Sequence, residues 1–159
     1  MHQALFDYFC THKQLVEILS HRTDTLSLPS YNNQVPGKRY QLTILLQQLM
    51  DVNEKIFVEQ AKQIIASEDV RYYYKATIFE VAGQADDPSE DLIRFMYECY
   101  SDSEWKRCVV SDVIMGNLPY VKKLKTYGFI ETWKDDLAYQ ALDSIKWLDP
   151  DFVVDAIKD

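Results

Sequence analysis

The spacing of the apolar residues restricts the fold of this chain more than any other feature. Four leucines follow the spacing i, i+3, i+4, i+7, which places them on one face of an α-helix: Leu42, Leu45, Leu46 and Leu49. A second set repeats this spacing later in the chain: Leu92, Phe95, Met96 and Cys99. No stretch of the sequence shows the two-residue alternation of a strand, and 4 Gly and 5 Pro are few for a chain of strands and tight turns. The sequence therefore predicts an all-α fold.

The 159 residues fit a single domain, 1–159, with three parts. An N-terminal helical segment, 1–21, is expected to break near Thr11. A loop at 22–37 contains Pro29, Pro36 and Gly37, and its length indicates a functional segment, a partly disordered one, or a boundary between units. The remaining residues, 38–159, are predicted to form helix pairs.

Polar residues and glycines predict where these helices begin and end. Side chains that accept hydrogen bonds from the first free N–H groups of a helix are expected at four starts: Asn53, Asp87 with Glu90, Ser101 with Glu104, and Asp149 before Pro150. Helix ends are expected at three glycines: Gly83, Gly116 and Gly128.

A weak repeat of helix pairs underlies the prediction of a higher-order architecture. Gly83 and Gly116 are separated by the same interval as Asp69 and Asp102, and helix pairs of about this length build HEAT-like solenoids. We therefore expect antiparallel helix pairs stacked as a short HEAT-like solenoid. The alternative is an irregular helical bundle, because any series of capped helices of similar length looks periodic.

Charge, cysteine content and hydropathy indicate the cellular location of the protein and the partners that it disfavours. The chain has 17 Lys and Arg against 25 Asp and Glu, a net charge of -8, which disfavours nucleic acid and anionic membrane surfaces as partners. The lysine cluster at Lys122, Lys123 and Lys125 is interpreted as a solvated helix face. Three widely spaced cysteines, Cys10, Cys99 and Cys108, form no disulfide framework. Because the first residues resemble no signal peptide and no apolar run reaches about 20 residues, we predict a cytoplasmic protein.

The motifs of nucleotide and metal sites are missing from the sequence. The one Gly-Lys pair, Gly37-Lys38, is followed by Arg39 where a P-loop needs Ser or Thr, and Asn32 stands where the first glycine belongs. Cys10, His12 and His21 lack the paired spacing of structural zinc ligands. We therefore predict no cofactor, no metal and no binding of ATP or GTP.

No arrangement of residues in the sequence indicates catalysis. All three histidines lie in the first segment, and no nucleophile elbow occurs. The carboxylates at 86–91 lie at a helix start, where negative charge offsets the helix dipole. The protein is accordingly predicted not to be an enzyme.

Aromatic and aliphatic residues mark the candidate interaction surface. Leu5, Phe6 and Phe9 lie in a cluster that spreads around its helix, so that one neighbour cannot cover it. In the Tyr72-Tyr73-Tyr74 run, Tyr73 and Tyr74 fit the inward face and Tyr72 is expected outside. We predict that residues 5–9 contact an absent domain or a second copy of the chain, and that Tyr72 is a further interface candidate. The last helix is expected to turn its one apolar stripe inward: Phe152, Val153, Ala156 and Ile157.

The order of several single residues resembles a known family. The residues that carry the likeness are spread over about 5–135: Phe6-Asp7-Tyr8, Val70-Arg71, Lys75, Asp87-Pro88, Trp105, Arg107, Gly116-Asn117, Gly128-Phe129-Ile130 and Trp133. They resemble the helical-repeat region beside the ATPase module of bacterial STAND-type NTPases, the NACHT-containing class; Val121 departs from the aromatic pair expected at 120–121.

This resemblance implies a non-catalytic interaction or linker module, a piece of a larger signalling protein, whose partner is a protein or a neighbouring domain. The alternative is a stand-alone acidic α-helical regulatory or adaptor protein.

Overall fold

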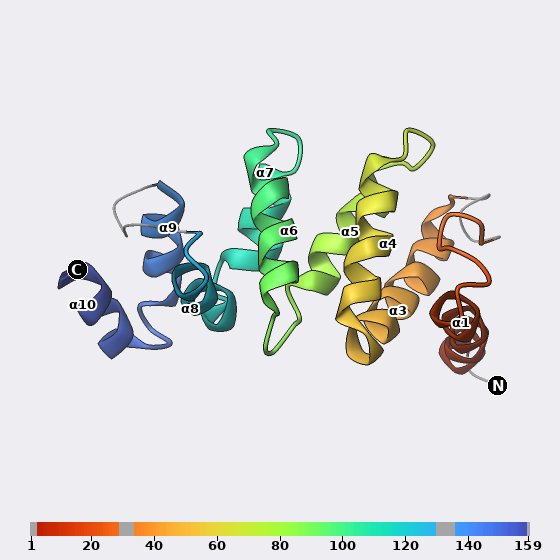
Figure 1. Cartoon of the computed structure of the whole chain (residues 1–159), viewed down its shortest axis with the longest axis horizontal. Helices are drawn as coiled ribbons and strands as arrows, with labels where there is room; N and C mark the ends of the chain where they lie inside the picture. The colour runs from red at the N-terminus through yellow and green to blue at the C-terminus, as the bar shows by residue number, and fades with distance from the viewer. Residues whose placement is uncertain (1–2, 29–33, 130–135, 159) are drawn as a thin grey trace. The chain divides into compact units, whose positions relative to one another are not determined.

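The structure, a computed structural model, describes residues 3–28, 34–129 and 136–158 (Figure 1). Within these ranges every regular element is a helix and none is a strand, which confirms the predicted all-α fold. The chain divides into two units, Met1–Ala82 and Gly83–Asp159, which we describe separately. Asn32, Ile130 and Trp133, on which parts of the sequence interpretation rest, lie outside the described residues.

The first unit is built around α3. Its helices are α1 (Gln3–Leu19), α3 (Pro36–Val52), α4 (Glu54–Ala66) and α5 (Tyr72–Ala82). Helix α3 packs against α1, α4 and α5, and its four leucines of helical spacing are all buried, as their pattern predicted. Helix α1 contributes Leu15 and Ile18 to this core.

The second unit is a series of helices in which each packs on the next. They are α6 (Glu90–Ser101), α7 (Lys106–Cys108), the π-helix η1 (Val109–Ile114), α8 (Leu118–Thr126), α9 (Asp136–Ile145) and α10 (Pro150–Lys158). Helix α7 continues directly into η1, where the backbone widens so that the Met115 N–H donates to the Val110 carbonyl at 2.9 Å.

The predicted helix caps are right at two starts and wrong at two others. Asn53 and Asp149 each accept a hydrogen bond from a backbone N–H in the first turn of the helix that follows. Asn117, which the sequence analysis did not name as a cap, does the same for α8. At α6 the cap is Ser89, which accepts from the Leu92 N–H, and the expected Asp87 instead forms an ion pair with Lys123.

The second expected capping box does not form, because Ser101 is the last residue of α6. Its hydroxyl donates to the Tyr97 carbonyl at 3.2 Å, and Asp102 accepts from the Glu104 N–H at 2.9 Å. These two contacts end one helix and turn the chain, whereas α7 begins without a side-chain cap. Asp102 thus stabilises the turn before α7, but no side chain takes the capping role that the spacing assigned to Ser101.

The break predicted near Thr11 is also wrong, because α1 runs unbroken from Gln3 to Leu19. The Thr11 side chain is buried and its hydroxyl donates to the Tyr8 carbonyl at 2.9 Å, which satisfies a β-branched polar residue inside the helix. The turn that follows α1 contains His21, whose φ of 53° is left-handed.

The stacking of helix pairs is compatible with both predicted architectures. In the first unit α3 contacts α5, the next helix but one, and in the second unit α6 contacts α8 in the same way. Stacked helix pairs make such contacts, and so does an irregular bundle. The described packing fits a helical bundle in each unit, and the solenoid stays a prediction.

One predicted burial fails at the last helix. Val153 and Ala156 are buried, but Ile157 is 71% exposed and Val154 is 51% exposed. At about 100° per residue Val154 lies well off the buried stripe, whereas Ile157 lies only about 40° around the helix from Val153, at the edge of that stripe. Helix α10 therefore presents apolar surface on the outside of its unit.

Candidate interaction surface

Helix α1 packs on α3 through a face that is polar in its first half. The side chains on this face follow the helical spacing 7, 11, 15, 18, and all four are buried: Asp7, Thr11, Leu15 and Ile18. A carboxylate and a hydroxyl thus occupy the inner face in the first half of the helix, and two aliphatic side chains occupy it in the second half.

The buried carboxylate is bound by its neighbour on α3. The Gln41 side-chain N–H donates to an Asp7 carboxylate oxygen at 2.8 Å. A hydrogen bond to a charged group stabilises by about 1.5–3 kcal/mol, and a buried carboxylate without partners is strongly disfavoured. This bond fixes which side of α1 turns toward α3.

The outer face of α1 is apolar, which reverses the usual pattern of a surface helix. Five large side chains there are about half exposed: Leu5 (50%), Phe6 (55%), Tyr8 (48%), Phe9 (62%) and Val16 (45%). We call these five residues the α1 face. Single exposed apolar residues are common on proteins, but a contiguous group of this size marks an interaction site.

Two aromatic rings of the α1 face contact each other, and one of them also stacks on a histidine. The Tyr8 and Phe9 rings meet edge to face with centroids 6.0 Å apart, and Tyr8 stacks on His12 at 6.4 Å. The helix thus offers a ready-made aromatic surface of the kind that supplies much of the energy of protein interfaces.

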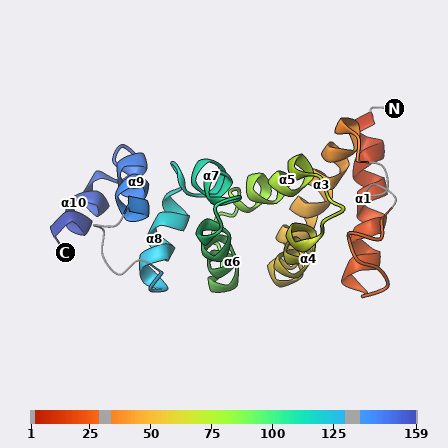
Figure 2. The ribbon, with the colours of Figure 1, turned by 90° about the horizontal axis from the view of Figure 1, so that it is seen from above.

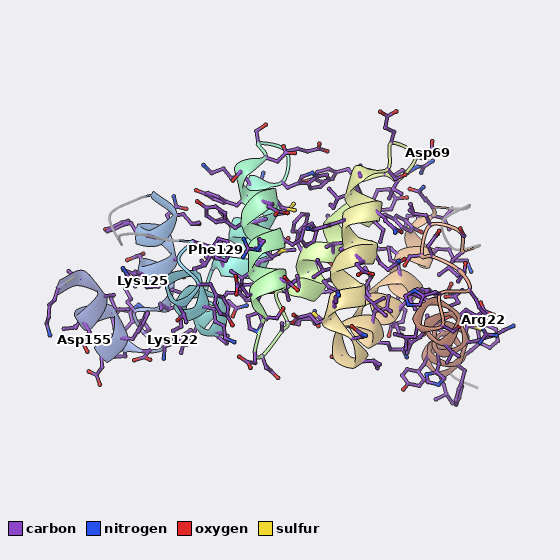
Figure 3. All side chains as sticks on the ribbon, viewed as in Figure 1. Arg22, Asp69, Lys122, Lys125, Phe129 and Asp155 are labelled. Carbon is purple, nitrogen blue, oxygen red and sulfur yellow. The ribbon has the colours of Figure 1, made fainter. Side chains whose placement is uncertain are left out.

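The rim of the α1 face carries cations. Lys13 and Arg22 are exposed, and Arg22 extends outward from the turn after α1 (Figure 3). The Arg22 Nε donates to the Ser20 hydroxyl at 2.7 Å, whereas Lys13 forms no ion pair within the described part of the chain. Glu17, half buried, is the acidic residue next to this rim.

Tyr72, the other candidate predicted from sequence, is exposed on a different helix. Its side chain is 51% exposed at the start of α5, whereas Tyr74 is buried and donates its hydroxyl hydrogen to the Val35 carbonyl at 2.9 Å. Burial raises the pKa of Tyr74, as expected for a phenol inside the core. Both views place α3 between α1 and α5 (Figures 1 and 2), so α5 does not extend the α1 face.

A second exposed apolar surface lies at the end of the second unit. It consists of Trp147 (85% exposed), Leu148 (58%), Val154 (51%) and Ile157 (71%), and we call it the α10 face. Sequence reasoning missed it, because Ile157 was assigned to the inner stripe. The adjacent Trp147 and Leu148, which precede the Asp149 cap in a turn, were the available signal.

The α10 face has an acidic rim. Asp151 is exposed and forms no ion pair among the described residues, and Asp155 projects from α10 (Figure 3). Lys158 contacts Asp155 at 3.1 Å, but this pair is largely solvated and contributes little. Lys146 is engaged with Asp143 at 2.7 Å.

One hollow of the second unit brings two carboxylates to the same place. An open hollow of about 710 Å³ beside η1 is lined by two carboxylates, Asp86 and Asp112, with Met115, Asn117 and apolar neighbours. Histidine, cysteine and lysine are absent from its lining, so neither carboxylate faces a nucleophile there. Among the described residues, no three His, Cys, Asp or Glu side chains come together as a metal site, and Cys10, Cys99 and Cys108 form no disulfide.

In the described ranges no helix has the length and apolar character needed to cross a membrane. Comparison with protein-family models, curated proteins and solved structures found no match for this chain.

Proposed function

We propose that the protein is a non-catalytic helical interaction module and that the α1 face is its binding surface. The observation that carries this proposal is the reversed pattern of α1, in which Asp7 and Thr11 point inward while Phe6 and Phe9 point outward. Aromatic side chains on the outer face do not stabilise the packing of α1 on α3. They stabilise a complex in which a partner covers that outer face.

The size of the α1 face suits a moderate or weak interaction. Since a large side chain has about 150–250 Å² of surface, five half-exposed side chains present roughly 500 Å². At ~25 cal/mol per Å² this area is worth roughly 12 kcal/mol before costs, and the loss of rigid-body freedom on association cancels much of it. The net affinity expected is that of a reversible contact between proteins or domains.

The resemblance to the helical repeats of STAND-type NTPases supports a place inside a larger protein. In that setting the solenoid would pack its repeats on neighbouring domains in the cytoplasm, and the α1 face would be one such contact. The alternative, a stand-alone regulatory or adaptor protein, uses the same face against a separate partner. The reading frame that encodes the chain distinguishes the two, because a STAND protein carries a Gly-x-x-x-x-Gly-Lys-Ser/Thr segment in the same frame.

Site-specific crosslinking in the cells that make the protein tests the binding surface. We would replace Phe9 on the α1 face with the photoreactive amino acid benzoylphenylalanine. The matched control carries the same substitution at Tyr40, an aromatic residue of α3 that is 53% exposed. We expect a defined adduct, or an internal crosslink to another domain of the same polypeptide, from position 9 alone.

Equal labelling from both positions, or none from position 9, would show that the α1 face is not a binding surface. A second variant, Phe6→Ser/Phe9→Ser, should lose the partner while keeping the helical circular dichroism spectrum of the parent, because both side chains lie outside the core.

A further inference from the structure

We propose that the α1 face of one molecule binds the α10 face of a second copy, so that the chains associate head to tail. This inference rests on the proposed role of the α1 face and names the partner for it. The α10 face is the second exposed apolar surface described above, and it belongs to the other unit of the chain. One molecule therefore carries both halves of the contact.

The two faces match in apolar area. The α1 face presents five half-exposed apolar side chains, and the α10 face presents four that are exposed between 51% and 85%. With side chains of about 150–250 Å², each face offers roughly 500 Å², so the contact buries about 1,000 Å² in total. That area lies at the lower end of specific interfaces and predicts a weak, reversible association.

The two faces are opposite in charge. The rim of the α1 face carries Lys13, which forms no ion pair within the described ranges, and Arg22. The rim of the α10 face carries Asp151, which is likewise unpaired there, and Asp155. Bringing the faces together places Lys13 of one copy near Asp151 of the other. This attraction offsets part of the repulsion between two molecules of net charge -8.

A symmetric contact lacks this complementarity. Two α1 faces would bring Lys13 and Arg22 of one copy against the same cations of the other, with only the half-buried Glu17 of each copy to offset them. Two α10 faces would oppose Asp151 and Asp155 with themselves, with only the lysine that already contacts Asp155 to offset them. Like charges across an interface are unfavourable. The head-to-tail arrangement is therefore the one that satisfies both rims, and it continues beyond a dimer unless a ring closes.

Two variants with one disabled face each test the arrangement. Phe6→Ser/Phe9→Ser removes the α1 face and leaves the α10 face, and Val154→Ser/Ile157→Ser does the reverse. Light scattering coupled to gel filtration would follow the parent and each variant from about 10 µM to about 1 mM, the range in which a weak complex assembles. Tyr139→Ser, which changes a 68% exposed aromatic residue outside both faces, is the matched control.

We expect the parent and the Tyr139→Ser control to gain mass with concentration, each double variant alone to stay monomeric, and an equimolar mixture of the two variants to form a dimer that grows no further. The mixture restores one intact contact between one α1 face and one α10 face. Reversing the rim charges, Lys13→Glu and Asp151→Lys, should weaken self-association of each single variant and restore it in their mixture.

Three results would overturn the inference. Self-association of the Val154→Ser/Ile157→Ser variant alone would indicate that α1 faces bind each other. Self-association of the Phe6→Ser/Phe9→Ser variant alone would indicate the same for α10 faces. A parent that is monomeric throughout the series would exclude the second copy as partner, while the crosslink at position 9 would still decide whether the α1 face binds another protein.

Discussion

Gly83 gives the sharpest test of the packing in the second unit. It follows the last residue of α5, where the sequence predicted a helix end. The structure shows a different reason for glycine, because a Cβ atom built there would lie 1.9 Å from the backbone carbonyl oxygen of Asp112 and 3.3 Å from the Cα of Val113. The turn at Gly83 thus lies directly against the backbone of η1.

The cost of Gly83→Ala follows from this geometry. Ordinary contact begins at 3.4 Å, so the turn and η1 would have to separate by 1.5 Å, the difference between 3.4 and 1.9 Å. The obstructing atoms belong to helical backbone, which has no rotamer to change. Overpacking of this kind typically destabilises by about 1–3 kcal/mol and at times by more, and we expect about 2–4 kcal/mol here.

Gly37→Ala supplies the matched control. Gly37 is the second residue of α3, and nothing lies within 4 Å of an added Cβ atom. The same chemical change should there stabilise by about 0.5–1 kcal/mol, because alanine loses less backbone entropy on folding.

Urea unfolding followed by far-UV circular dichroism measures both variants. We expect the midpoint of the parent to lie between a lower midpoint for Gly83→Ala and a higher one for Gly37→Ala. Equal midpoints for the two variants would refute the close approach of the turn at Gly83 to η1.

Three further predictions concern helix ends. His21→Gly should raise the melting temperature by stabilising about 0.5–1 kcal/mol, because His21 holds a left-handed φ of 53° that glycine adopts freely; an unchanged melting temperature would contradict this backbone assignment. Asn117→Ala should destabilise by about 1–2 kcal/mol in urea, since it removes both the cap of α8 and the bond from its side-chain N–H to the Gly83 carbonyl at 2.8 Å; an unchanged midpoint would argue against the cap. Hydrogen bonding to Lys122 holds the pKa of Asp149 below its usual value, so its stabilisation is present above the unfolded pKa and is lost as pH falls through the folded one. Asp149→Asn should therefore lower the free energy of unfolding by a constant amount above this pH window, and this difference from the parent should disappear in acid. A difference that stays constant down to low pH would contradict the role of the Asp149 charge.

Features of the fold that depend on contacts between residues close in sequence were predictable, and features that depend on distant contacts were not. The leucine stripe of α3 and the caps at Asn53 and Asp149 were predictable, because their partners lie within one or two helical turns. The start of α6 was not, because Asp87 forms a pair with Lys123, which is distant in sequence. Ser89 then caps the helix two residues later.

The candidate surface shows the same division. The density of apolar residues at 5–9 indicated that one neighbour could not cover them all, and Phe6 and Phe9 are indeed exposed. The burial of Asp7 on the inner face of α1 was not predicted, because its partner is Gln41, across the loop in α3. The α10 face was missed for a related reason, since the periodicity of α10 alone does not say how wide a stripe its neighbour covers.

The orientation of α1 is fixed from both of its ends, and this makes the outward aromatic residues a property of the fold. Rotating the helix by about half a turn would bury Phe9 and expose Leu15 and Ile18, which face α3 together with Asp7. It would also break the hydrogen bond between Asp7 and Gln41, which is worth about 1.5–3 kcal/mol. The outward phenylalanine rings are already about half buried, so completing the burial of each returns less than the full value of about 1.5–3 kcal/mol, whereas Leu15 and Ile18 would lose that value in full. With the hydrogen bond of Asp7 lost as well, the rotation brings no net gain. The aromatic side chains therefore stay outside in the isolated molecule, and only a second surface can bury them.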